Sequence, residues 1–476
     1  MISDLPRALA RFTFAMMLFL LAGCSPAAVP EESLDPGAVV VEGALGTPVL
    51  LANGDSTVYA RIRIGTQQKA LRPRGPVNVA LAIDTSGSME GAAIEEARRA
   101  ALQMIGSLKD GDRIAVVVFH SKAEVLLPST ELNDEVRADM QSRIGAMAAR
   151  GTTDMAAGLQ TAFEQVQSHF EPKGVNRVVL LGDGIPNNGS SIEYTVRSAA
   201  DRGIAITTVG LGLDYDETLM GKIADMSGGR YRYIESADKL AGFFQEELDQ
   251  MDRVYGRRAS ASITAGPGVR IDSVVGGETP GPGNAAHIPL GDIARGDSRD
   301  LLLRLTVTPR KAGVPIELLD AVITFDDALG SAGRLERRVY LGARTTLDES
   351  EVAKAKVPEV ELSAALAEAS ATTIRALEMS KQGRYTAART MLTKGAEAAM
   401  SQAARTPSTE LTKLATNMTS VAKEMPLEDR VAVPTPSPAA ETGYDFADDA
   451  LPAPSEAPSV MKLRKEVHQS AVEALH

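Results

Sequence analysis

The sequence predicts an α/β protein with a mainly parallel central sheet, a β-sandwich flank and a C-terminal helical segment. Short apolar runs alternate with helical stretches over residues 77–252, which is typical of a parallel sheet covered by helices on both faces. Strand-like segments separated by Gly, Pro and Asn turns occupy 38–76 and 253–345, as in a sandwich. The 476 residues exceed what one hydrophobic core serves, so we expect several domains.

The elements of the central domain are predicted from their apolar spacing. The expected strands are 77–83, 113–119, 178–181, 204–209 and 231–234. The expected helices are 92–107, 134–148, 154–170, 191–202, 215–226 and 237–251. Since the segments on both sides are rich in strands, and domain termini often lie close together, we expect 38–76 and 253–345 to form one sandwich into which the central domain is inserted.

The C-terminal part predicts helices and a tail. Residues 350–426 are Ala-rich with helical spacing, and Gly383 and Pro407 separate about three helices. We expect a packed appendage, with a protein-docking surface as the alternative. Residues 427–459 are rich in Pro, Ala and Asp and predict disorder, followed by a short helix over 460–476. The basic cluster at 462–465 is expected to pair with the acidic stretch at 445–449.

The first 23 residues predict a secretory signal peptide. Arg7 and Arg11 precede an apolar run over 12–21, which is too short to span a bilayer. The tetrapeptide LAGC, ending at Cys24, resembles the bacterial lipobox, in which the Cys is acylated; a buried thiol is the alternative. Ser25 then favours the outer membrane over the inner one. We expect a lipid-anchored protein of the bacterial cell envelope, with 24–37 as a flexible tether.

Composition and missing motifs exclude several classes of function. The net charge of −12 argues against nucleic acid as a partner, because phosphate binding needs a basic surface. One Cys excludes a disulfide framework and a Cys-based metal site, and the five His residues lack zinc spacing. There is no nucleophile elbow, no phosphate-binding loop and no His base in a segment that matches the serines. We therefore expect a protein that is not an enzyme.

Oxygen-bearing side chains follow the first strand of the central domain. The strand at 77–83 runs directly into the sequence DTSGS at 84–88. Ligand sites in an open parallel sheet lie beyond the carboxyl ends of the strands. Two later segments occupy comparable places: GTTD at 151–154 precedes a helix, and GDG at 182–184 ends a strand. The three segments are therefore expected to meet at one edge of the sheet.

We expect these segments to form one metal site. Its candidate ligands are Asp84, Ser86, Ser88, Thr153 and Asp183. All offer hard oxygen donors, which suit Mg²⁺, Mn²⁺ or Ca²⁺ and disfavour zinc or copper. Magnesium is the ion we expect, and because it usually keeps several waters, a position stays open for an outside carboxylate. Thr152 is the alternative to Thr153.

These residues resemble the metal-ion-dependent adhesion site of von Willebrand factor type A domains, over about residues 77–250. The resemblance implies a Rossmann-like fold with the metal at the upper edge of the sheet. It also implies direct ligation by Ser86, Ser88 and Thr153, with Asp84 and Asp183 often acting through water. Many members have Thr or Ser where this chain has Gly182, from which we expect little effect. The whole chain is similar to bacterial envelope proteins with this domain and, more distantly, to inter-alpha-trypsin inhibitor heavy chains.

The function expected from these observations is metal-dependent protein binding, as an adhesion or scaffold lipoprotein. A partner protein with an exposed Asp or Glu would complete the coordination of the ion. The alternative is an envelope assembly scaffold that acts through its helical region and retains the metal site only for structure. A hydrolase regulator or chelatase-like subunit is disfavoured, because the sequence supplies no base and nucleophile pair.

Overall fold

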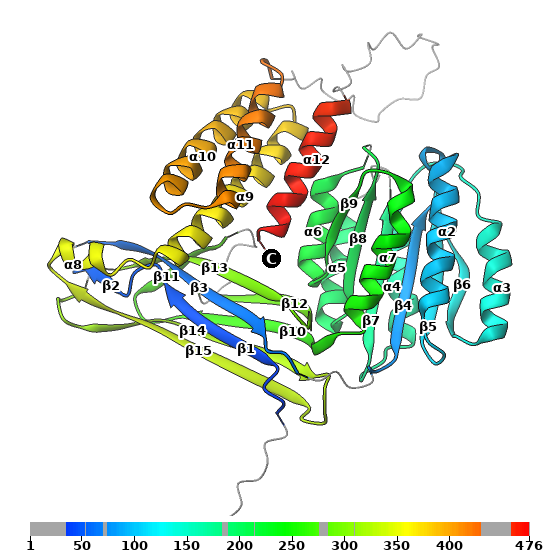
Figure 1. Cartoon of the computed structure of the whole chain (residues 1–476), viewed down its shortest axis with the longest axis horizontal. Coiled ribbons are helices and arrows are strands. Elements are labelled where there is room, and N and C mark those ends of the chain that lie inside the picture. Colours follow the sequence, from blue (N-terminus) through cyan, green and yellow to red (C-terminus); the bar gives the residue numbers. More distant parts are fainter. Residues whose placement is uncertain are drawn as a thin grey trace, which may run out of the picture.

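The computed structural model describes residues 35–52, 54–69, 74–182, 189–213, 215–275, 284–308, 310–429 and 458–475. Figure 1 shows three parts: a central α/β domain, an elongated sandwich of strands, and a group of helices above the sandwich. The predicted signal peptide, Cys24 and most of the predicted tether lie outside the described residues, as do Asp183 and residues 430–457 of the tail predicted over 427–459. None of the helices in the described ranges is long and apolar enough to cross a membrane.

The central domain is built on a six-stranded sheet with the order β6-β5-β4-β7-β8-β9. Neighbouring strands are parallel except for β5 and β6. The strands are β4 (Val77–Asp84), β5 (Arg113–Phe119), β6 (Ala123–Glu131), β7 (Val175–Gly182), β8 (Ala205–Leu211) and β9 (Tyr231–Ile234). The predicted mainly parallel sheet is confirmed. The antiparallel edge strand β6 was not predicted.

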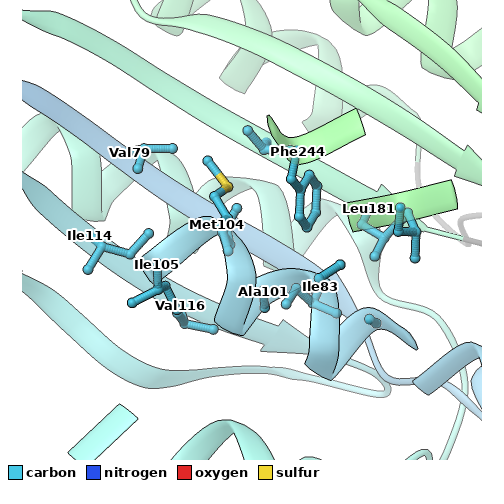
Figure 2. Packing of buried hydrophobic residues seen from close by; sticks show 14 of the residues in the cluster. Val79, Ile83, Ala101, Met104, Ile105, Ile114, Val116, Leu181 and Phe244 are labelled. Atoms are coloured by element: carbon cyan, nitrogen blue, oxygen red, sulfur yellow. The ribbon is translucent and has the colours of Figure 1, made fainter. Parts of the chain in front are cut away.

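Helices cover both faces of this sheet because the side chains of each strand alternate between two cores. On one face Val79 and Ile83 pack with Met104, Ile105 and Phe244 (Figure 2). The helices of this face are α2 (Ala92–Ser107), α3 (Asp134–Gly145) and α7 (Leu240–Met251). The other face is covered by α4 (Met155–Ser168), α5 (Gly189–Arg202) and α6 (Glu217–Ser227). Both faces of β4 are therefore buried, which explains its continuous apolar sequence.

The sandwich contains strands from both sides of the central domain. A four-stranded sheet has the order β1-β3-β13-β11, and a five-stranded sheet has the order β12-β10-β14-β15-β2. In the first sheet β3 pairs with β13 along its length, for example Val58 with Leu305. The early strands are β1 (Val39–Leu45), β2 (Val49–Leu51) and β3 (Ser56–Thr66). The later strands are β10 (Val254–Ala265), β11 (Val269–Val274), β12 (Ala285–Ala294), β13 (Ser298–Val307), β14 (Pro315–Asp327) and β15 (Arg334–Thr346). No strand was predicted where β12 lies.

Buried ion pairs join the central domain to the sandwich. Arg177, at the start of β7, contacts Glu247 of α7 at 3.2 Å and Asp292 of β12 at 3.1 Å. Thr207 of β8 also donates to Glu247, at 2.9 Å. These side chains are buried together, so removing one of them would leave a buried charge without its partner. The predicted tether is also held in part, since Asp35 forms an ion pair with Arg337 of β15 at 2.8 Å.

The C-terminal helices form a bundle that rests on the sandwich. They are α8 (Glu349–Lys354), α9 (Pro358–Lys381), α10 (Tyr385–Arg405), α11 (Thr409–Glu424) and α12 (Pro458–Glu473). Residues 350–426 thus hold the short α8 in addition to the three helices expected there. Tyr59 of β3 donates to Glu368 of α9 at 3.1 Å, which anchors the bundle. Figure 1 shows α12 between the bundle and the central domain.

Within the described residues, the 462–465 cluster pairs with carboxylates of the central domain. Lys462 contacts Glu235, which follows β9, and Lys465 contacts Glu217 at the start of α6. Both carboxylates belong to the central domain. The acidic stretch at 445–449, which we expected to pair with this cluster, lies outside the described residues.

Candidate metal-ion site

The first segment of the site is the loop that follows β4. Asp84, the last residue of this strand, is fully buried at the carboxyl edge of the sheet. Its Oδ1 accepts a hydrogen bond from the backbone N–H of Ser86 at 2.8 Å, which closes a tight turn. Ser86 Oγ lies 3.0 Å from Ser88 Oγ. The loop therefore gathers one carboxylate and two hydroxyl groups within five residues.

The second segment is tied to the first by backbone hydrogen bonds. Gly87 N donates to Gly151 O at 3.0 Å, and Arg150 N donates to Thr85 O at 2.7 Å. Gly151 has a φ of +70°, and a Cβ atom at this position would lie 2.4 Å from Ser121 Oγ. Glycine is therefore required where the two loops cross.

The structure distinguishes the two candidate threonines. Thr152 is exposed, and its backbone N–H and hydroxyl both bond to Ser121 Oγ, at 3.1 and 3.3 Å. Thr153 is half-buried beside Asp154, whose carboxylate caps α4 by accepting from Ala157 N. The hydroxyl of Thr152 is thus bonded to Ser121 rather than turned toward Ser86 and Ser88. This favours Thr153 as the candidate ligand.

The third segment begins at the end of β7. A Cβ atom at Gly182 would lie 3.6 Å from Asp84 Oδ2, so this strand ends against the buried carboxylate. Asp183 is the next residue and lies outside the described residues. The described part thus brings Asp84, Ser86 and Ser88 together and places the Thr153 segment against them.

The donor set contains few carboxylates. In the described part of the chain, no group of three or more His, Cys, Asp or Glu side chains is close enough together to hold a metal ion. Asp84 is the carboxylate contributed by the described site residues, and the other candidate donors there are hydroxyl groups. Such a set excludes soft metals and suits a hard cation that keeps water.

Sequence reasoning missed the side chains beside the second segment. His120 is buried and its Nε2 accepts from Arg150 Nε at 3.0 Å, while Arg150 also forms an ion pair with Glu124 at 3.0 Å. The backbone O of His120 accepts from Asp154 N at 2.6 Å. These bonds fix the loop that carries Thr153. In the sequence, the position of Arg150 directly before GTTD was the feature that could have indicated these contacts.

Comparison with known proteins identifies the central domain. The family profile of the von Willebrand factor type A domain matches residues 78–246. The chain contains a von Willebrand factor type A domain. The predicted fold class and the resemblance of the central domain to von Willebrand factor type A domains are thereby confirmed. Domains of this type typically bind proteins and commonly hold a divalent cation.

Relatives in sequence match part of this chain. The uncharacterized protein YfbK of Escherichia coli (strain K12) is 30% identical over 261 residues, which are 50% of this chain and 43% of YfbK. Human inter-alpha-trypsin inhibitor heavy chain H4 is 30% identical over 185 residues, or 36% of this chain and 20% of that protein. The chain therefore spans less than half the length of these two relatives.

Solved structures match a larger part of the fold. A von Willebrand factor type A protein from Catenulispora acidiphila superimposes with a TM-score of 0.66 at 19% identity, covering 81% of this chain and 90% of that one. The ArnB paralog VWA2 from Sulfolobus acidocaldarius gives a TM-score of 0.54 at 16% identity, covering 82% and 98%. Coverage of this extent includes more than the domain itself, so the fold is shared beyond the central sheet.

Proposed function

We propose that the von Willebrand factor type A domain binds a protein partner through a divalent cation. Ser86, Ser88 and Thr153 would hold the ion directly, and Asp84 and Asp183 would support it through water. An exposed Asp or Glu of the partner would complete the coordination. The observation that carries this proposal is the loop at 84–88, which gathers three oxygen-bearing side chains at the carboxyl edge of the sheet.

The spacing of the two serines fits a hard divalent cation such as magnesium. In octahedral coordination with bonds of 2.0–2.1 Å, adjacent ligand oxygens lie about 2.9 Å apart. Ser86 Oγ and Ser88 Oγ are already 3.0 Å apart. Calcium binds six to eight oxygens at about 2.3–2.6 Å, and in its pentagonal-bipyramidal geometry adjacent oxygens lie about 2.7–3.1 Å apart, so the same spacing also fits calcium. The pair therefore needs little movement to hold such an ion.

The charge of the site supports capture of a carboxylate. Asp84 and Asp183 together balance a divalent charge, so a third carboxylate from a partner is attracted only weakly by net charge. Its binding gains mainly from replacing a water on the ion and from contacts with the surrounding surface. We expect modest affinity, with specificity set by residues around the loops rather than by the ion.

The cellular location is part of the same proposal. We propose that the signal peptide is removed before Cys24, and that acylation of this residue anchors the protein in the outer membrane of a bacterium. The lipobox-like sequence and Ser25 support this location. Incorporation of radiolabelled palmitate into the full chain, and its loss in Cys24→Ala, is the measurement that checks it.

Two measurements on a soluble form, residues 25–476, test the binding function. Isothermal titration with MgCl₂ and MnCl₂ should show one site in the parent protein and none in Asp84→Ala. Asp134→Ala, which removes an exposed carboxylate at the start of α3, is the matched control and should bind as the parent does. Titration heat that is unchanged in Asp84→Ala would contradict the assignment of the site.

The second measurement is capture of partners from an envelope extract, with Mg²⁺ or with EDTA. A partner present only with metal and an intact Asp84 supports carboxylate capture. A partner that is retained in EDTA and in Asp84→Ala supports the alternative, a scaffold that acts through the helical region. The bundle anchored on the sandwich is the structural feature that would serve that role.

A further inference from the structure

Helix α12 lies in the seam between the central domain and the helical bundle, and it contributes to the core of each. Val467 packs with residues of α9, α10 and α11, whereas Val472 packs in the core beneath α4, α5 and α6. Ala471, between them in the sequence, is fully buried. Leu463 and Leu475 are partly buried and pack at the margins of the neighbouring clusters. Apolar contact is therefore one part of the interface between α12 and its neighbours.

A buried carboxylate provides the polar part of the interface with α12. Glu217, the first residue of α6, is 2% exposed. It contacts Lys465 at 3.1 Å and Arg464 at 3.0 Å, both from α12, and Lys381 of α9 at 3.3 Å. Burial raises the pKa of Glu217, but these three cations outweigh it and hold the pKa well below its usual range. Two of the three charges that stabilise this buried carboxylate thus arrive with α12.

Lys465 also holds the loop that precedes α6. Its Nζ donates to the backbone O of Tyr215 at 2.8 Å and lies 3.7 Å from the centre of the Tyr215 ring. This loop follows the carboxyl end of β8. Because β4, β7 and β8 are parallel neighbours, the loop lies at the same edge of the sheet as Asp84. The helix therefore makes contact with the edge that carries the candidate metal site.

The same helix covers the free edge of the central sheet. Strand β9 is the last in the order, and the backbone N–H of Tyr233 donates to Gln469 Oε1 at 2.9 Å. His468 contacts the ring of Tyr231 edge-on, with ring centres 5.4 Å apart. A Cβ atom at Gly221 of α6 would lie 3.0 Å from His468 Cε1, so glycine lets the two helices approach. The seam is thus shaped to receive a helix.

We propose that this seam is a helix-binding site, and that α12 occupies it as a releasable intrachain ligand which holds the β8–α6 loop in place. Residues 430–457 join α12 to the rest of the chain, so docking is intramolecular and a weak interface is enough to keep it bound. The ion pairs form at the cost of desolvating each charge, and charges that regain water on release recover part of that cost, which offsets part of the interface strength. Release would leave Glu217 with Lys381 and would free the Tyr215 carbonyl.

The test uses the full chain with a specific protease site inserted between residues 430 and 457. After cleavage the α12 fragment should dissociate on dilution or on competition with a labelled peptide of residues 458–476, while the remaining protein keeps its circular dichroism spectrum. Hydrogen exchange over 212–217 should rise when the fragment leaves. An α12 fragment that departs only when the whole protein unfolds would show a permanent core helix and overturn the proposal.

Matched variants distinguish the contribution of Glu217 from that of other contacts with α12. Glu217→Gln should raise the dissociation constant of the labelled peptide roughly tenfold or more, since it removes a buried carboxylate from two cations of α12. The control is Glu473→Gln in the peptide, which alters an exposed ion pair between α12 and Arg232 of β9. This variant should change the dissociation constant by less than about twofold. Equal effects of the two variants would refute the role of Glu217.

These readouts use neither metal nor partner, so they stand apart from the proposed function. Loss of magnesium binding with normal peptide exchange would remove the adhesion proposal and leave the helix-binding site. A dimer that forms by exchange of α12 between two cleavage-resistant chains would identify the same site with a second copy as its occupant. That outcome would overturn the intrachain assignment.

Discussion

Acidification should loosen α12, because His468 is buried in its neutral form. The side chain is 1% exposed, between Gly221 and Tyr231. Burial, together with the nearby cations Lys381 and Lys465, lowers the pKa of His468 to about 4. The carboxylates that face it, Glu217 and Asp225, act in the opposite direction and are outweighed.

The direction and size of the effect follow from this difference in pKa. Once α12 is released, His468 regains its ordinary value and takes up a proton below about pH 6.5, which the docked form resists. The stability contributed by the neutral side chain is therefore complete above pH 6.5 and is lost progressively as the pH falls toward 4. The free energy of opening should decrease by about 2 kcal/mol between pH 7 and pH 5, with a limit of about 3 kcal/mol at lower pH.

Hydrogen exchange measured residue by residue provides the assay. The opening free energy of amides in α12 is compared at pH 7 and pH 5, after correction for the intrinsic pH dependence of exchange. His468→Leu removes the titrating group and keeps apolar volume against Gly221, so its opening free energy should change by less than about 0.5 kcal/mol over the same range. A similar decrease in both proteins, or no decrease in the parent, would refute the reasoning.

Two further predictions concern stability. Arg177→Met should lower the free energy of unfolding by about 3–5 kcal/mol in urea titration, because the buried carboxylates Glu247 and Asp292 both lose the buried Arg177 guanidinium. Arg230→Met is the control: this exposed side chain lies 3.9 Å from the same carboxylate and should cost less than about 1 kcal/mol. Equal losses would contradict the role of burial. Phe244→Ala should lower the free energy of unfolding by about 3–5 kcal/mol in the same titration, since it leaves a cavity in the core shown in Figure 2. A loss below about 1 kcal/mol would mean that α7 repacks to fill the cavity.

The central sheet could be predicted because its strands are buried on both faces and contain few polar residues. The two strands that were missed have a physical feature in common. β6 contains Pro128 and β12 contains Pro289, and both lie at the edge of their sheets beside an irregular register. Proline removes a hydrogen-bond donor from a strand and is tolerated at edges and bulges. A pattern search for alternating apolar residues passes over such strands.

The candidate site was predictable only where its residues are contiguous. The sequence at 84–88 forms one turn, so the approach of Asp84, Ser86 and Ser88 is a local property. The contact between Ser121 and Thr152 joins two loops that are far apart in the sequence. The periodicity of apolar residues does not predict such a contact. This hydrogen bond is the observation that favours Thr153 over Thr152.

The basic cluster near the C-terminus shows why sequence proximity is a poor guide to ion pairing. An exposed ion pair contributes little in water. Glu217 is buried, and an isolated buried carboxylate costs several kcal/mol. The cations of α12 are therefore worth most beside Glu217, although 248 residues separate it from Lys465. The need of this carboxylate for partners, rather than the length of the connection, determines where the end of the chain docks.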